Sequence, residues 1–157
     1  MAASDLTVIA GDLIDAFNQS DWARFKALLA PDIRYEETGT QRRLEGADAY
    51  VQLCQGWKNA FPDATGTIRN TAASNNTVAQ ELTWEATHTG PLESPTGTIP
   101  PSGKRALTQA TVWLIFQGDK AQEIHHHLDV LSLLQQIGAL PTPRKPSQWA
   151  LNPSVNP

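Results

Sequence analysis

Residues 106–130 read ALTQATVWLIFQGDKAQEIHHHLDV, and this stretch predicts a hairpin of two long strands. Residues 106–116 are largely apolar, and residues 121–130 continue the extended pattern after a tight turn at QGD (residues 117–119). The second strand carries three of the chain's four histidines, followed closely by an aspartate. The same stretch therefore predicts the centre of a sheet and holds the side chains best suited to proton or metal chemistry.

The rest of the chain predicts helices before this hairpin and a single helix after it. Apolar residues three or four positions apart, with capping or stopping residues, predict helices over residues 6–17 (Ser4 as N-cap), 22–29 (ended by Pro31), 47–60 and 130–137 (Gly138 as C-cap). Further strands are predicted over residues 33–37, 65–74 and 78–89. This order predicts an α+β fold, in which a curved antiparallel sheet with helices on one side forms a cone with a pocket at its mouth.

Two proline-rich segments fall outside these elements. Residues 90–103 (GPLESPTGTIPPSG) hold four of the eleven prolines and predict a long loop, of the kind that often forms a lid. Residues 142–157 predict a tail without periodic structure, which is either disordered or laid over a neighbouring subunit. We therefore expect one domain over residues 1–141.

Composition excludes several classes of protein. The net charge of -4 gives no indication of nucleic-acid binding, and no apolar run approaches the roughly 18 residues of a membrane span. The N-terminus has no secretion signal, so a cytoplasmic location is expected. The single cysteine excludes an internal disulfide, and an exposed sheet face in a chain with five tryptophans predicts a homodimer.

Strand alternation divides the histidines between the two faces of the sheet. His125, His127 and Asp129 fall on one face, whereas His126 falls on the other face with aliphatic neighbours. Two imidazoles and a carboxylate resemble a metal-ligand set. Alternate residues of a strand lie about 6–7 Å apart, however, and a metal site usually draws ligands from more than one element. We therefore expect no metal.

Acid–base chemistry is the second interpretation of the face that carries Asp129. An aspartate deep in an apolar cone loses hydration, which would raise its pKa toward neutrality, and a neighbouring imidazole could orient it. Such a pair could move a proton to or from a carbon flanked by carbonyl groups. The structural alternative is that Asp129 caps the helix beginning at Val130 and that the histidines are solvated.

Other residues could form the wall or rim of the pocket. His88 ends a strand just before the long loop, where it would lie at the rim or simply hydrogen-bond the strand end. The tryptophans and Tyr35 fit either a core or a pocket wall, and Gln109 shares a strand face with Trp113. The candidate substrate contacts are Trp57, Trp84, Trp113, Tyr35, Gln109 and His125.

Three segments carry a resemblance to a known family. WEATHTGPLESPTGTIPPSGKR (residues 84–105) resembles a signature of the SnoaL-like polyketide cyclases, also called ester cyclases. HHHLDVLSLLQQIGAL (residues 125–140) resembles the matching end of those proteins, and DWARFKALLAPDIRYEE (residues 21–37) follows their layout. The resemblance covers about residues 5–141. It implies the cone-shaped α+β barrel of the nuclear transport factor 2-like superfamily.

The resemblance also implies a cofactor-free enzyme that acts on a small hydrophobic substrate containing carbonyl groups. Family cyclases close a ring by intramolecular aldol condensation, and the position of Asp129 matches their acid/base aspartate. His88 and His127 match polar positions that would contact substrate carbonyls. The alternatives that remain open are an isomerase, hydratase or epoxide hydrolase on the same fold, and a protein that binds a small molecule without turnover.

Overall fold

The computed structural model describes residues 2–141, and the predicted tail at residues 142–157 lies outside them. Four helices are present in this part of the chain: α1 (Ala3–Asn18), α2 (Trp22–Ala27), α3 (Ala47–Ala60) and α4 (Val130–Gln136). Within residues 2–141, none of the helices combines the length and the apolar character that crossing a membrane requires. The predicted α+β fold class is confirmed.

A six-stranded sheet runs in the order β2-β1-β8-β7-β4-β3. Its strands are β1 (Leu29–Glu37), β2 (Arg42–Glu45), β3 (Thr65–Ser74), β4 (Thr77–Thr87), β7 (Arg105–Gln117) and β8 (Lys120–Leu128). The sheet is mixed, because β1 runs parallel to β8 while all other neighbours are antiparallel. The prediction of a purely antiparallel sheet was wrong at this pair, because β1 and β8 are far apart in sequence and no hairpin turn sets their direction.

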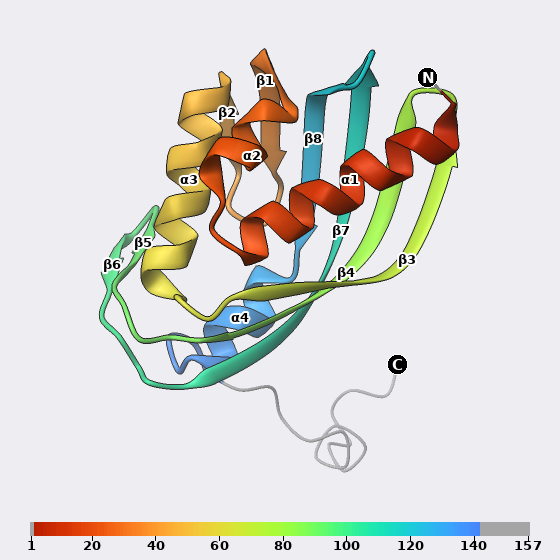
Figure 1. Cartoon of the computed structure of the whole chain (residues 1–157). Helices are drawn as coiled ribbons and strands as arrows, with labels where there is room; N and C mark the ends of the chain where they lie inside the picture. The colour runs from red at the N-terminus through yellow and green to blue at the C-terminus, as the bar shows by residue number, and fades with distance from the viewer. Residues whose placement is uncertain (1, 142–157) are drawn as a thin grey trace, which may run out of the picture.

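The helices cover only one face of the sheet, and the sheet curls beneath them (Figure 1). Helix α1 lies across β3 and β4, α3 lies over β1, and α4 closes the end of the cone beside β7. The even-numbered residues of β4 and β7 point toward the helices and are the more buried set, as alternation requires. The interior of the cone is therefore built from one face of each strand.

Two predicted helix ends and one predicted loop differ from the structure, each for a local reason. Ser4 lies inside α1, which begins at Ala3 with no side-chain cap. Helix α2 ends at Ala27, and Pro31 lies in the early part of β1, where the pairing with β8 shifts and a missing N–H is tolerated. The segment predicted as a loop contains a short hairpin of β5 (Leu92–Ser94) and β6 (Gly97–Ile99). Its strands are three residues long and fit between the prolines.

A polar link joins the end of α1 to the sheet. The Asn18 side chain donates to the carbonyl oxygen of Gly66 at 2.9 Å and accepts from the Gly66 N–H at 2.8 Å. The Lys58 ammonium donates to the carbonyl oxygens of Asn18 at 3.1 Å and Ala64 at 2.7 Å. These bonds satisfy backbone groups that the helix and strand ends leave free, and they hold α1 over β3.

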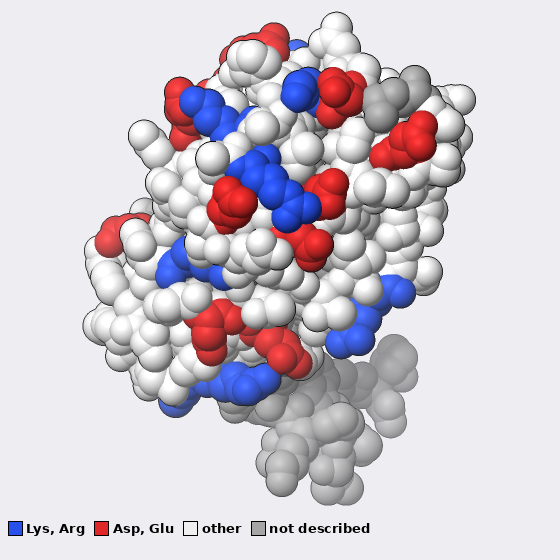
Figure 2. All heavy atoms as spheres, in the orientation of Figure 1, with Lys and Arg blue, Asp and Glu red and all other residues white. Residues whose placement is uncertain are grey.

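Charged side chains on the helix-bearing face lie in small groups of mixed sign (Figure 2). The pairs there include Arg24–Asp12 at 2.8 Å and Lys26–Asp48 at 2.6 Å, both between partly exposed groups. Exposed pairs of this kind contribute little to stability, on the order of 0–1 kcal/mol each. Burial of the apolar cone is therefore the main stabilising contribution on this side of the molecule.

Gly90 provides a test of the packing between the β4 end and α3. A Cβ added at Gly90 would overlap the carbonyl oxygen of Asn59, which is backbone and cannot move away easily. We expect Gly90→Ala to lower the free energy of unfolding by about 1–3 kcal/mol in urea titration. The control is Gly11→Ala in α1, where a Cβ meets nothing within 4 Å. This change should raise stability by about 0.5–1 kcal/mol, and equal effects of the two changes would contradict the described packing.

Candidate active site

A cavity of about 100 Å³ lies between the sheet and the helices, with room for several water molecules or a small ring. Its walls are mainly apolar and aromatic, and they come from α1, α3, α4 and the inner face of the sheet. Representative lining residues are Phe17, Tyr50, Trp57, Trp84, Val112 and Leu133. A cavity of this character favours an apolar ligand with a few polar groups.

Glu37 is a fully buried carboxylate beside His126, which lines this cavity. Its Oε2 accepts from the Tyr35 hydroxyl at 2.7 Å, and its Oε1 accepts from the Thr40 hydroxyl at 2.6 Å and from Arg42 at 3.4 Å. The Glu37 side chain has no exposed surface, whereas that of Arg42 is 27 % exposed. The hydrogen bonds and the counter-ion together replace the hydration that the carboxylate loses on burial.

His126 lies next to this carboxylate on the neighbouring strand. The parallel pairing of β1 and β8 sets Glu37 opposite His126, and the Tyr35 oxygen lies 3.0 Å from His126 Nδ1. Because the Tyr35 hydrogen is donated to Glu37, the Tyr35 oxygen accepts from Nδ1–H. The network thus assigns the ring hydrogen to Nδ1 and leaves an unprotonated Nε2, which is buried without a partner.

Burial fixes the protonation of the groups around His126. Desolvation lowers the pKa of His126 from its ordinary value of 6.5, and His127 adds to this effect, while the charge of Glu37 opposes it. Desolvation raises the pKa of both Tyr35 and Tyr50 well above the ordinary value, so both keep their hydroxyl hydrogens. The two tyrosine rings stack with centroids 4.4 Å apart. The site therefore holds a neutral imidazole at neutral pH.

Three of the residues predicted as pocket wall line this cavity. Tyr35, Trp57 and Trp84 all contribute to it, and Phe17 packs edge-to-face on Trp84 with centroids 5.1 Å apart. Trp84 also lies near His126, with centroids 6.2 Å apart. The sequence did not decide between core and wall for these aromatic residues, and in the structure they serve as both.

Asp129, His127 and Gln109 lie together, but outside the cavity. They line a polar hollow on the outer face of the sheet, and all three are exposed. The Asp129 carboxylate caps α4 by accepting from the Ser132 N–H at 3.0 Å, and His127 Nδ1 lies 3.0 Å from the Thr38 hydroxyl. The expectation that Asp129 lies deep in the apolar cone was wrong, because the helices cover the opposite face of β8.

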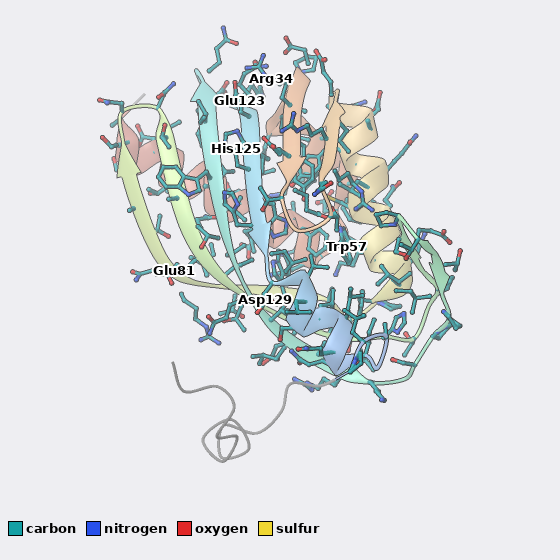
Figure 3. The ribbon with its side chains drawn as sticks, turned by 180° about the vertical axis from the view of Figure 1, so that it is seen from behind. Arg34, Trp57, Glu81, Glu123, His125 and Asp129 are labelled. Carbon is teal, nitrogen blue, oxygen red and sulfur yellow. The ribbon has the colours of Figure 1, made fainter. Side chains whose placement is uncertain are left out.

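His125 and Trp113 pair across β8 and β7 and also lie on the outer face of the sheet. Figure 3 views the molecule from this side and labels His125. His125 Nε2 is 3.4 Å from a carboxylate oxygen of Glu123, which also binds Arg34. Trp113 is 45 % exposed and does not line the cavity. Neither His125 nor Trp113 is placed to contact a ligand in the cavity. The homodimer that was predicted from an exposed sheet face stays a prediction.

His88 does not meet the other predicted site residues. It is fully buried, its Nδ1 accepts from the Ser102 N–H at 3.2 Å, and its ring lies 5.1 Å from that of Phe61. Its backbone extends the pairing of β4 and β7 through bonds to Lys104 and Gly103. Burial lowers the pKa of His88. This arrangement matches the alternative of a hydrogen-bonded strand end.

Sequence reasoning missed two polar residues that line the cavity and the carboxylate behind them. Gln80 and His126 line the cavity, Glu37 accepts from the cavity residue Tyr35, and none of the three was among the candidates. Alternation offered a usable signal, because His126 shares a face with the apolar Ile124 and Leu128, both of which line the cavity. The same rule applied to β1 puts Tyr35 and Glu37 on one face.

Comparison with known proteins agrees with this architecture. A family model for SnoaL-like polyketide cyclase matches residues 7–137. The chain belongs to the SnoaL-like polyketide cyclase family. The resemblance seen in the sequence is thereby confirmed. A separate comparison with curated proteins found no significant match.

Solved structures show the same fold. AclR from Streptomyces galilaeus, provisionally assigned as a hydroxylase, is 25% identical, with a TM-score of 0.81 and coverage of 95% of this chain and 90% of AclR. A provisionally assigned SnoaL-like polyketide cyclase from Jannaschia sp. CCS1 is 15% identical (TM-score 0.79; 88% and 95% covered). IdmH from Streptomyces antibioticus, provisionally a polyketide cyclase, is 21% identical (TM-score 0.72; 85% and 98% covered). The family and its cone-shaped fold are thus established for this chain.

The Tyr35 hydroxyl provides a test of the Glu37–His126 network. Tyr35→Phe would leave buried polar atoms on both Glu37 and His126 without a partner, so we expect a loss of about 1–3 kcal/mol in the free energy of unfolding. The matched control is Tyr50→Phe, which removes only a hydroxyl interaction with Cys54 and should cost less. Chemical denaturation of the two variants measures the difference, and a larger loss for Tyr50→Phe would refute the network.

Proposed function

We propose that this protein is an acid/base enzyme that removes a proton from a carbon next to a carbonyl group, with His126 as the base. The observation that carries the proposal is the unprotonated Nε2 of His126, which is buried without a partner on a residue that lines the apolar cavity. A general base must present a lone pair to the substrate proton, and a pKa near the working pH favours transfer in both directions. Membership of a polyketide cyclase family supports this type of chemistry.

The proposed reaction is an aldol-type ring closure or a related proton transfer. His126 Nε2 takes the proton, and the electron pair of the broken C–H bond moves onto the carbonyl oxygen to form an enolate. The enolate carbon then forms a C–C bond with a second carbonyl carbon of the same substrate. The resulting alkoxide takes the proton back from His126, so that no cofactor is consumed and the base is regenerated.

Glu37 and Tyr35 would support the charged form of His126 during this reaction. The Glu37 carboxylate lies 3.9 Å from His126 Nδ1, and the Tyr35 oxygen bridges the two side chains. A fixed negative charge stabilises an imidazolium much more effectively in an apolar, water-poor site than in water. Through these contacts Glu37 and Tyr35 would act as positioning residues, which orient His126 and stabilise the proton that it carries.

Replacing His126 and Asp129 by the same residue tests which one is the base. His126→Asn keeps a donor near Nδ1 for Tyr35 but removes Nε2, and Asp129→Asn keeps an oxygen that can cap α4. With cyclohexanone as a model ketone in D2O, we expect His126→Asn to reduce catalysed deuterium exchange at the α-carbon by about 10²–10⁴-fold. Asp129→Asn should leave the exchange rate, measured by NMR, within about twofold, since Asp129 lies outside the cavity.

The reverse pattern would return the catalytic role to Asp129. Exchange lost in Asp129→Asn and retained in His126→Asn would show that the outer hollow, rather than the cavity, holds the reactive group. Circular dichroism of both variants controls for folding. If wild-type protein bound cyclohexanone without accelerating exchange, the proposal of an enzyme would be replaced by that of a binding protein.

The pH dependence of exchange gives a second test. His126 acts as a base only when neutral, and desolvation keeps its pKa below 6.5 despite the opposing charge of Glu37. As the pH falls, kcat/KM should therefore decline with a midpoint below pH 6.5. A pH–rate profile with its acidic limb at or above 6.5 would show that another group, or an exposed histidine, controls the reaction.

A further inference from the structure

Polar side-chain atoms without partners are concentrated in the cavity. Among residues 2–141, five buried side-chain nitrogen or oxygen atoms have no hydrogen-bond partner, and four of them belong to Gln80, Trp84 and His126. All three residues line the cavity. A buried polar group without a partner costs on the order of 1–3 kcal/mol, so its retention requires an explanation. A ligand with polar groups of its own would supply the missing partners.

The strand register arranges these atoms around one space. Gln80 pairs with Val112, which pairs with His126, so the three residues form one row across β4, β7 and β8. Gln80 and His126 thus lie two strands apart, about 10 Å between Cα atoms, and face the same side. Since this face is concave, their side chains converge above Val112. Trp84 lies four residues after Gln80 on β4 and therefore faces the same side.

The chemistry of these groups defines what they could hold. The Trp84 indole N–H can only donate, and the Gln80 amide offers N–H donors, so together they suit a carbonyl oxygen. Neutral donors that point at an oxygen stabilise the negative charge that develops on it as an enolate forms. No lysine or arginine of the described residues lines the cavity. The site therefore suits an uncharged ligand better than a carboxylate or a phosphate ester.

We propose that Gln80 and Trp84 form an oxygen-binding pair, which holds the carbonyl oxygen of a neutral, apolar ketone or ester opposite His126. This inference rests on the proposed function for its catalytic meaning. The binding of the carbonyl group can nevertheless be tested without turnover. The pair selects a carbonyl-bearing ligand over a hydrocarbon of the same shape, because only the carbonyl oxygen satisfies the Trp84 and Gln80 donors.

The test compares the binding of cyclohexanone with that of methylenecyclohexane, which has the same ring and shape without the carbonyl oxygen. Equilibrium dialysis should show that Gln80→Leu and Trp84→Phe each weaken the binding of cyclohexanone by about 3- to 10-fold. Neither change should weaken the binding of methylenecyclohexane, because Leu and Phe are apolar and fill most of the space of the side chains that they replace. The control is Gln117→Leu at the exposed end of β7, which should change neither affinity.

Stability provides an independent measurement on the same variants. Gln80→Leu removes two buried polar atoms without partners, so we expect it to raise Tm by about 2–6 °C while it weakens binding of the ketone. A structural role for Gln80 predicts the opposite sign, a lower Tm. A lower Tm, or an equal loss of affinity for cyclohexanone and methylenecyclohexane, would overturn the proposal.

The outcomes also separate this inference from the proposed function. If His126→Asn abolishes exchange while Gln80→Leu and Trp84→Phe bind cyclohexanone like the wild type, His126 is supported as the base and the oxygen-binding pair is wrong. If Gln80→Leu and Trp84→Phe lose the preference for cyclohexanone while His126→Asn still exchanges normally, the oxygen-binding pair is supported and the proposed base is wrong.

Discussion

The burial of the Glu37 carboxylate is the constraint on which the site depends. A charged group without exposed surface is very unfavourable unless hydrogen bonds and a counter-ion replace its hydration. The short strand β2 meets this requirement, because its antiparallel register places Arg42 opposite Glu37. Tyr35 on the same face of β1 and Thr40 in the turn supply the other donors. The edge of the sheet is thus organised around one carboxylate.

The parallel pairing of β1 and β8 carries the effect of this carboxylate into the cavity. It sets Glu37 opposite His126, and Tyr35 connects them through one hydroxyl group. The tautomer of the imidazole follows from this chain of donors and acceptors, since the Tyr35 hydrogen is used by the stronger acceptor. In an antiparallel arrangement the direction of β1 would be reversed, and Tyr35 and Glu37 would meet different residues of β8.

Local sequence signals predicted much of the fold and part of the site. The helix over residues 47–60, the long hairpin of β7 and β8, and the separation of His126 from its two neighbours all follow from periodicity. Alternation gives two faces of a strand but does not state which one the helices cover. The pairing of β1 with β8 spans about 90 residues of sequence and leaves no local signal. The family resemblance, together with the polar face that Asp129 shares with His125 and His127, therefore directed attention to Asp129, although the more apolar face of β8 is the buried one.

Gly66, which has no side chain to react, fixes the position of the Trp84 indole N–H, one of the two proposed donors. A Cβ on Gly66 would lie 2.6 Å from the ring of Trp84, so only glycine lets this ring lie flat against β3. Asn18 at the end of α1 binds both backbone groups of Gly66 and holds this part of β3 in place. The orientation of the Trp84 ring therefore depends on a helix end and a glycine, neither of which touches the proposed ligand. For the same reason, a larger side chain at position 66 would displace the indole N–H while leaving every polar group of the cavity present.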